Sequence, residues 1–281
     1  MGAIYVGTCS WSEFTEFYPP GLPSNQQIAH YAQRFAIVEL NASFYRLMPA
    51  HNYAAWARRT PRGFMFDVKP FRQLTWHDRR EPPTPDVAAT FSASVGPLRE
   101  AGKLGALTFQ FPPWFTRSAT NLAYLRTLRD QFPNDPLSVE FRHNSWLRPE
   151  ALPELQQALS EAHIALGIVD EPQVGSGSIP TVPVVTTPEL SVVRFHGRNA
   201  AKWYAEVERA SDRFDYLYSL EELDEWVPKL ASLADQAQQV HVLFNNNVHD
   251  YAVTNALQLH ERLRLALGSQ VVMPTSPALP L

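Results

Sequence analysis

The chain has 281 residues, 45% of them hydrophobic and 19% charged, so it can bury a large core and lies near the upper end of single-domain size. Its formal net charge of −4 argues against a general nucleic-acid-binding protein, because non-specific affinity for phosphates needs an excess of Lys and Arg. The single cysteine, Cys9, excludes an intramolecular disulfide, and the lack of a membrane-length apolar run or secretory signal favours a cytoplasmic protein that does not enter the membrane.

Strand-like apolar runs alternate with amphipathic segments of helical length along almost the whole chain. The predicted strands cover residues 4–8, 37–41, 64–69, 105–111, the first part of 139–146, 164–170, 191–196 and 240–245. The predicted helices cover residues 24–35, 51–59, 86–100, 118–131, 149–161, 219–238 and 250–267. Strict alternation of this kind is typical of parallel α/β units.

The long connections complete the predicted architecture. Residues 171–190 contain four prolines and no helical period, so we expect an irregular loop in place of the sixth helix. Residues 197–218 form a long aromatic-rich loop. Residues 271–281 contain three prolines, and we expect a C-terminal tail that lies on the surface or is disordered. The alternation therefore predicts an α/β fold, a single (β/α)₈ TIM-type barrel over residues 1–270, rather than an open doubly wound sheet.

Polar side chains recur in phase at the ends of the predicted strands. In a barrel enzyme the active site lies at the carboxyl ends of the strands, and alternate residues of each strand point inward. The residues expected to point into this mouth are Glu39, Asn41, Asp67, Lys69, Thr108, Gln110, Glu140, Arg142, Asp170, Arg194, His196, His241 and Asn245. The residues between them are mostly apolar and would pack on the helices.

Two interpretations of this polar set remain open. Buried charges are costly unless paired, so the carboxylates should neighbour Lys69, Arg142 and Arg194. A purely structural ion network that closes the barrel would satisfy this requirement. A polar pocket for a small anionic or polyhydroxylated ligand would satisfy it equally, with carboxylates available for proton transfer.

The leading hypothesis is an enzyme that acts on a small anionic or sugar-like substrate by acid–base chemistry, as a hydrolase, lyase or isomerase. We expect Glu140 or Asp170 to transfer the proton, with Lys69 and His196 completing the catalytic set. Lys69, Arg142 and Arg194 would hold the anion and stabilise developing charge. The expected substrate-binding residues are Glu39, Asn41, Tyr45, Gln110, Arg142, Trp146, Arg194 and Asn245.

The alternative hypotheses use the same cleft. A metal-dependent phosphodiesterase, a nucleic-acid-processing protein or a ligand-binding protein would each need a polar mouth. An oxygen-rich divalent metal site could draw on the acidic and histidine residues Glu39, Glu140, Asp170, His143, His196 and His241. No HExxH motif is present, and Arg198 follows His196 closely. We therefore predict no cofactor, with a divalent metal as the alternative, and no nucleic-acid partner.

Several segments, in this order, resemble the YecE-like family, known as domain of unknown function 72. They are GTCSW at Gly7, FYP at Phe17, ELNASFYR at Glu39, QFPP at Gln110, VEFRHNSW at Val139, VRFHGR at Val193, DYLYSLEEL at Asp215 and FNNN at Phe244. The resemblance covers nearly the whole chain and implies a barrel, in agreement with the alternation. It implies no established reaction.

Overall fold

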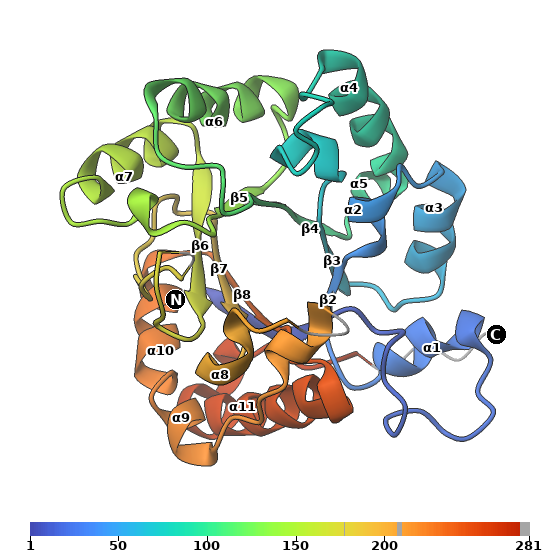
Figure 1. Cartoon of the computed structure of the whole chain (residues 1–281). Helices are drawn as coiled ribbons and strands as arrows, with labels where there is room; N and C mark the ends of the chain where they lie inside the picture. The colour runs from blue at the N-terminus through green and yellow to red at the C-terminus, as the bar shows by residue number, and fades with distance from the viewer. Residues whose placement is uncertain (177, 207–209, 276–281) are drawn as a thin grey trace.

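The computed structural model describes residues 1–176, 178–206 and 210–275. Eight parallel strands form a closed barrel in sequence order, with helices around it (Figure 1). The strands are β1 (Ala3–Cys9), β2 (Ile37–Leu40), β3 (Met65–Val68), β4 (Leu104–Gln110), β5 (Leu137–Glu140), β6 (Ile164–Asp170), β7 (Leu190–Phe195) and β8 (Gln239–Phe244). The barrel closes where β8 pairs with β1 along Ala3 to Thr8. The predicted TIM-type barrel is confirmed.

The helices cover the outside of the barrel (Figure 1). The α-helices of five or more residues are α1 (Ser24–Tyr31), α3 (Ala50–Arg58), α4 (Pro85–Ser94), α5 (Gly96–Glu100), α6 (Ala119–Gln131), α7 (Leu152–Glu161), α9 (Leu220–Asp224), α10 (Val227–Gln236) and α11 (Tyr251–Leu267). Short α-helical or 3-10 turns are α2 (Ala42–Tyr45), η1 (Arg72–Thr75), η2 (Asn144–Trp146), α8 (Ala200–Trp203), η3 (Ala210–Phe214), η4 (Val248–Asp250) and η5 (Gly268–Gln270). Within the described ranges we find no helix with the length and apolar character needed to span a bilayer.

Two predicted helices are each divided in the structure. The segment expected at 86–100 becomes α4 and α5, and the segment expected at 219–238 becomes α9 and α10. Pro97 and Pro228 lie in the first turn of α5 and α10. Because proline has no backbone N–H, it is compatible with the start of a helix but not with its uninterrupted continuation.

The expected loop in place of the sixth helix is confirmed, because the described residues between β6 and β7 contain neither helix nor strand. The expected tail begins differently. Val271 is buried and forms a parallel bridge with Ile4, and the Val272 N–H donates to the Ile4 carbonyl at 2.9 Å. Residues 276–281 of the expected tail lie outside the described residues.

The barrel separates two groups of apolar side chains. The large group lies between strands and helices and includes outward residues such as Val38 and Phe66. The small group fills the inside of the barrel and consists of Cys9, Ile37, Ala106, Ala165, Leu190, Val192 and Leu243. The interior apolar layer is therefore confined to part of the barrel, and charged residues occupy the space nearer the carboxyl ends of the strands.

Candidate functional site

Strand register places the polar side chains on one interior face. Glu39 of β2 pairs with Cys9 of β1 and with Asp67 of β3, and Gln110 of β4 pairs with Glu140 of β5. Residues paired across parallel strands share a face of the sheet. The predicted inward direction therefore holds for these side chains, which converge from neighbouring strands.

Arg194 and Arg142 connect the buried carboxylates into one ionic cluster. Arg194 Nη2 lies 2.7 Å from Glu39 Oε1, and its Nη1 donates to Glu140 Oε2. Arg142 Nη2 lies 2.8 Å from Glu140 Oε1, and its Nη1 donates to Glu171 Oε2 at 2.9 Å. Both Glu39 and Glu140 are 0% exposed. Gly167 makes room for this arrangement, because a Cβ there would approach the Glu140 Cβ to 3.2 Å.

The pKa values of two carboxylates in the cluster, Glu140 and Glu171, shift in opposite directions. Burial alone would raise the pKa of Glu140, but the positive charges of Arg142 and Arg194 outweigh it and hold that pKa well below its usual range. Burial dominates at Glu171 and raises its pKa to about 7, although Arg142 opposes the shift. The cluster therefore favours the anionic form of Glu140, whereas the pKa of Glu171 lies near neutral pH.

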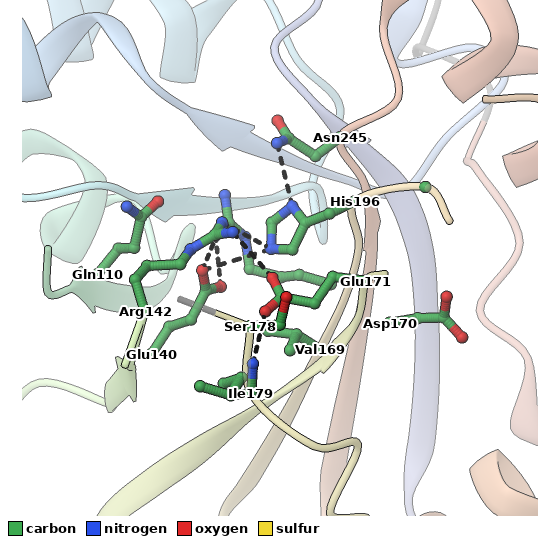
Figure 2. Close-up of polar contacts among 12 residues, drawn as sticks. Gln110, Glu140, Arg142, Val169, Asp170, Glu171, Ser178, Ile179, His196 and Asn245 are labelled. Carbon is green, nitrogen blue, oxygen red and sulfur yellow. Dashed lines mark hydrogen bonds and ion pairs between the residues drawn. The ribbon is translucent and has the colours of Figure 1, made fainter. Parts of the chain in front are cut away.

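His196 is a neutral hydrogen-bonding partner of Arg142. Burial and the nearby Arg142 charge lower the pKa of His196 to about 3. Its Nε2 lies 2.9 Å from Arg142 Nη2, and since a guanidinium only donates, Nε2 accepts. The proton of the neutral ring is then on Nδ1, 3.1 Å from the Asn245 amide. The Asn245 atom at this distance is Nδ2, so a hydrogen bond from His196 Nδ1 requires the Asn245 amide to turn its oxygen toward the ring. Figure 2 shows this chain from Glu140 through Arg142 and His196 to Asn245.

A cavity of about 560 Å³ opens at this end of the barrel. Its wall contains seven of the residues expected from the sequence, namely Asn41, Tyr45, Lys69, Gln110, Arg142, Arg194 and Asn245. Lys69 Nζ donates to Gln110 Oε1 at 3.0 Å and lies 4.3 Å from the centre of the Phe44 ring. Burial, followed by the positive charge of Arg194, lowers the pKa of Lys69 to about 8.

The connection after β7 supplies part of the wall. Figure 1 shows α8 in front of the strands, and Trp203, Arg213 and Phe214 line the cavity. The Trp203 ring lies 5.9 Å from the Arg142 guanidinium, and the Phe214 ring lies 5.7 Å from the His196 ring. The loop expected at 197–218 therefore covers the ionic cluster, with residues 207–209 outside the described part.

Comparison with known proteins places these features in a family. The model "Protein of unknown function DUF72" matches residues 5–279. The chain belongs to the DUF72 family. It is 37% identical over 271 residues to UPF0759 protein YunF of Bacillus subtilis (strain 168), covering 92% of this chain and 94% of that protein. The resemblance inferred from the sequence motifs is confirmed.

Crystal structures of two other DUF72 proteins share the fold. The protein from Enterococcus faecalis V583 has a TM-score of 0.86 and 32% identity, covering 93% of this chain and 95% of that chain. The protein from Thermotoga maritima MSB8 has a TM-score of 0.82 and 34% identity, covering 93% and 99%. Their names state family membership and give no activity.

Asp170 does not join the cluster in this DUF72 protein. It pairs with Phe195 in the register of β6 and β7, so it faces the helices rather than the mouth. Its carboxylate accepts from Arg198 Nε at 2.9 Å, from the Tyr218 hydroxyl at 2.8 Å and from Trp226 Nε1 at 2.8 Å. Figure 2 shows Asp170 directed away from Arg142. The expectation that Asp170 points into the mouth is therefore corrected.

Glu171 occupies the place that the sequence analysis gave to Asp170. Its Oε2 accepts from Arg142, and its Oε1 accepts from the Ile179 N–H at 2.9 Å. Glu171 was not expected at the mouth because it follows the last residue of the predicted strand, and the observed β6 also ends at Asp170. The alternation of Ala165, Gly167 and Val169 inside the barrel would have indicated the next odd-numbered position.

Trp146 is a packing residue rather than part of the cavity wall. It is 0% exposed, stacks on Phe141 with ring centres 4.4 Å apart, and donates from Nε1 to the Phe115 carbonyl at 2.6 Å. The expectation of substrate contact is corrected, because the turn after β5 directs this ring outward among the apolar side chains beneath the helices. Tyr45, by contrast, is 72% exposed at the rim of the cavity.

Asp67 and His241 form a separate pair inside the barrel. Both are 0% exposed, and His241 Nδ1 lies 2.9 Å from Asp67 Oδ1. The expected pairing of Asp67 with Lys69 or an arginine is therefore replaced by a histidine contact. Gly105 makes space here, because a Cβ at this position would lie 2.4 Å from Asp67 Oδ1. Among the described residues, no three His, Cys, Asp or Glu side chains converge as a metal-binding group would require.

Asp250 fastens the loop after β1 to the loop after β8. Its carboxylate accepts from the backbone N–H groups of Thr15 at 3.0 Å, Glu16 at 2.7 Å and Phe17 at 2.9 Å. Beside it, Asn247 Nδ2 donates to the Cys9 carbonyl at 2.7 Å and to Glu13 Oε2 at 3.1 Å. This rim clasp, formed by Asp250 and Asn247, positions Glu13 and Asn247 in the cavity wall.

Proposed function

We propose that the cavity is the active site of an enzyme that binds a small anionic or sugar-like substrate and transfers a proton through Lys69. The distribution of charge carries the proposal. Within the described part of the chain, four cationic residues, Lys69, Arg142, Arg194 and Arg213, line the cavity with a single carboxylate, Glu13. The carboxylates that balance Arg142 and Arg194 are at most 3% exposed. A ligand in the cavity therefore meets cationic donors before it meets those carboxylates, which favours an anion.

Lys69 suits proton transfer better than Glu140. A general acid or base works best with a pKa near the working pH, and the pKa of Lys69 is lowered to about 8. Glu140 has no exposed surface, and two guanidiniums stabilise its anion. In this proposal Glu140 holds Arg142 and Arg194, while the amides of Asn41, Gln110 and Asn245 bind hydroxyl or carbonyl groups of the substrate.

Sulfate binding tests the anion site, because sulfate keeps a constant charge across neutral and alkaline pH. We expect calorimetric titration to give saturable binding whose affinity falls as pH rises through about 8, the pKa of Lys69. The sign follows from protonation, since Lys69 attracts the anion only below its pKa. Arg142→Lys should weaken binding by about 1 to 3 kcal/mol, because a lysine cannot reproduce the planar fork.

Two lysine variants provide the matched comparison. Lys69→Met should weaken sulfate binding and remove its pH dependence in this range. Lys229→Met changes a residue that packs 4.8 Å from the Trp226 ring and does not line the cavity, so it should behave as the unmodified protein. Absence of saturable binding would reject the anion site, and an unchanged pH profile in Lys69→Met would remove Lys69 from its role.

A further inference from the structure

Lysine is scarce in this chain, and only one lysine lines the cavity. The sequence contains four lysines, Lys69, Lys103, Lys202 and Lys229. Lys103 is buried and donates to the carbonyls of Ala57 at 2.6 Å and Thr60 at 2.7 Å. Lys202 pairs with Asp215 at 2.6 Å. Lys69 is therefore the lysine amine placed to meet a bound ligand.

The surroundings of Lys69 are those of a nucleophilic amine. Its polar contact is the neutral Gln110 Oε1 at 3.0 Å. The nearby carboxylates Glu39 and Glu140 form their ion pairs with Arg142 and Arg194 instead. The Phe44 ring covers one side at 4.3 Å. An amine that is desolvated and close to other cations loses its proton more readily, which is how lysines become nucleophiles toward carbonyl groups. The lowered pKa agrees with this geometry.

We propose that Lys69 forms a Schiff base with a carbonyl compound that carries an anionic group, a carboxylate or a phosphate. This inference rests on the proposed function of the cavity, because the anionic group would be held by the guanidiniums of Arg142 and Arg194. Those two side chains line the same cavity as Lys69. The carboxylates that fix them, Glu39 and Glu140, are 0% exposed, whereas Arg142 is 8% and Arg194 2% exposed, so the part of the cluster that reaches the cavity is cationic.

The covalent step needs no oxidant or reductant. The lone pair of neutral Lys69 Nζ attacks the carbonyl carbon, a C–N bond forms, and the C–O π electrons move to oxygen. Proton transfer from nitrogen to oxygen gives a carbinolamine, and loss of water gives the imine. Gln110 Oε1 accepts one N–H and so orients the lone pair. The protonated imine then withdraws electrons from the adjacent carbon, which labilises a C–H or C–C bond there.

Reductive trapping tests the inference with defined probes. The full-length protein is incubated separately with pyruvate, 2-oxoglutarate and dihydroxyacetone phosphate in the presence of cyanoborohydride, and peptides are mapped by mass spectrometry. At least one probe should add one reduced carbon skeleton at Lys69. Its occupancy at neutral pH should exceed that at Lys229 by at least about tenfold, because a pKa lowered to about 8 makes the unprotonated fraction about 300 times larger than that of an ordinary lysine.

Sulfate competition and two lysine-to-arginine variants distinguish failure of the Schiff base from failure of the anion site. Sulfate should compete with trapping. Lys69→Arg keeps the charge and removes the nucleophile, so trapping at this site should disappear, whereas Lys229→Arg should trap normally at Lys69. Saturable sulfate binding without preferential labelling of Lys69 by any probe would overturn the Schiff base and leave the anion site intact. Failure of sulfate to bind would overturn both.

Discussion

Glu140 stands between two guanidinium groups with no exposed surface of its own. Taking such charges out of water is costly, and their mutual attraction compensates only while every partner is present. Removing the negative charge of Glu140 would leave the positive charges of Arg142 and Arg194 close together without the anion that separates them. At the residue scale, the stability of the mouth therefore depends on Glu140 more than on the ion pairs at the surface.

We predict that Glu140→Gln lowers the free energy of unfolding by about 3 to 5 kcal/mol, the range for breaking a buried ion pair. Glutamine preserves the shape, so the loss isolates the charge. Urea denaturation would measure it. Glu261→Gln is the matched control, because Glu261 pairs with Arg264 on an exposed surface of α11 and should change stability little. Equal effects of the two substitutions would contradict this account.

Strand parity explains which site residues could be predicted. Glu39, Lys69, Gln110, Arg142 and Arg194 follow the alternation that an inward-facing strand imposes, so the sequence locates them. Asp170 and Glu171 are neighbours on opposite faces, and the strand end alone could not distinguish them. Trp146 lies beyond β5, where a 3-10 turn sets its direction.

At the scale of elements, the connection after β7 differs from the other walls of the cavity. Its described part contains two short helical turns, α8 and η3. Side-chain hydrogen bonds such as that from Asn199 Nδ2 to the Asp215 carbonyl, at 2.8 Å, hold this part in place. The sequence shows that this connection is long and rich in aromatic residues. The contacts of the rings at positions 203 and 214 with Arg142 and His196 depend on tertiary packing and could not be predicted.

We predict faster amide exchange in residues 197–206 and 210–218 than in β7, and slower exchange there when sulfate is bound. The reason is that few backbone hydrogen bonds protect the described part of this connection, while an anion beside Arg142 would favour the arrangement in which Trp203 packs near Arg142. Hydrogen exchange with mass spectrometry provides the measurement. Residues 133–136, which precede β5 at the opposite end of the barrel, should not respond to sulfate. Core-like protection without sulfate would indicate a fixed loop.

On the scale of the whole molecule, the barrel could be predicted because period-two strands and helical segments alternate with regular spacing. The same pattern did not predict the helix interruptions at Pro97 and Pro228. It also did not predict the bridge between Val271 and Ile4. The buried acids have partners within the same chain: Glu39 has Arg194, Asp67 has His241, and Glu140 has both arginines.

This internal charge balance predicts that the fold does not depend on a bound metal ion. Treatment with a chelator should leave the melting temperature unchanged, since a structural metal would add its binding free energy to folding. Differential scanning calorimetry before and after chelation provides the test, with elemental analysis of the same sample. A stoichiometric metal whose removal markedly lowers the melting temperature would refute the prediction.

The rim clasp has a consequence for how the protein is made. Asp250 and Thr15 are separated by 235 positions, so their contact forms only after residue 250 has left the ribosome. Contacts of such long range close large loops and form slowly. A nascent chain that lacks its last βα unit would thus have Lys69, Arg142 and Arg194 without a closed wall around them. Anion binding during synthesis would report completion of the barrel rather than the folding of its first half.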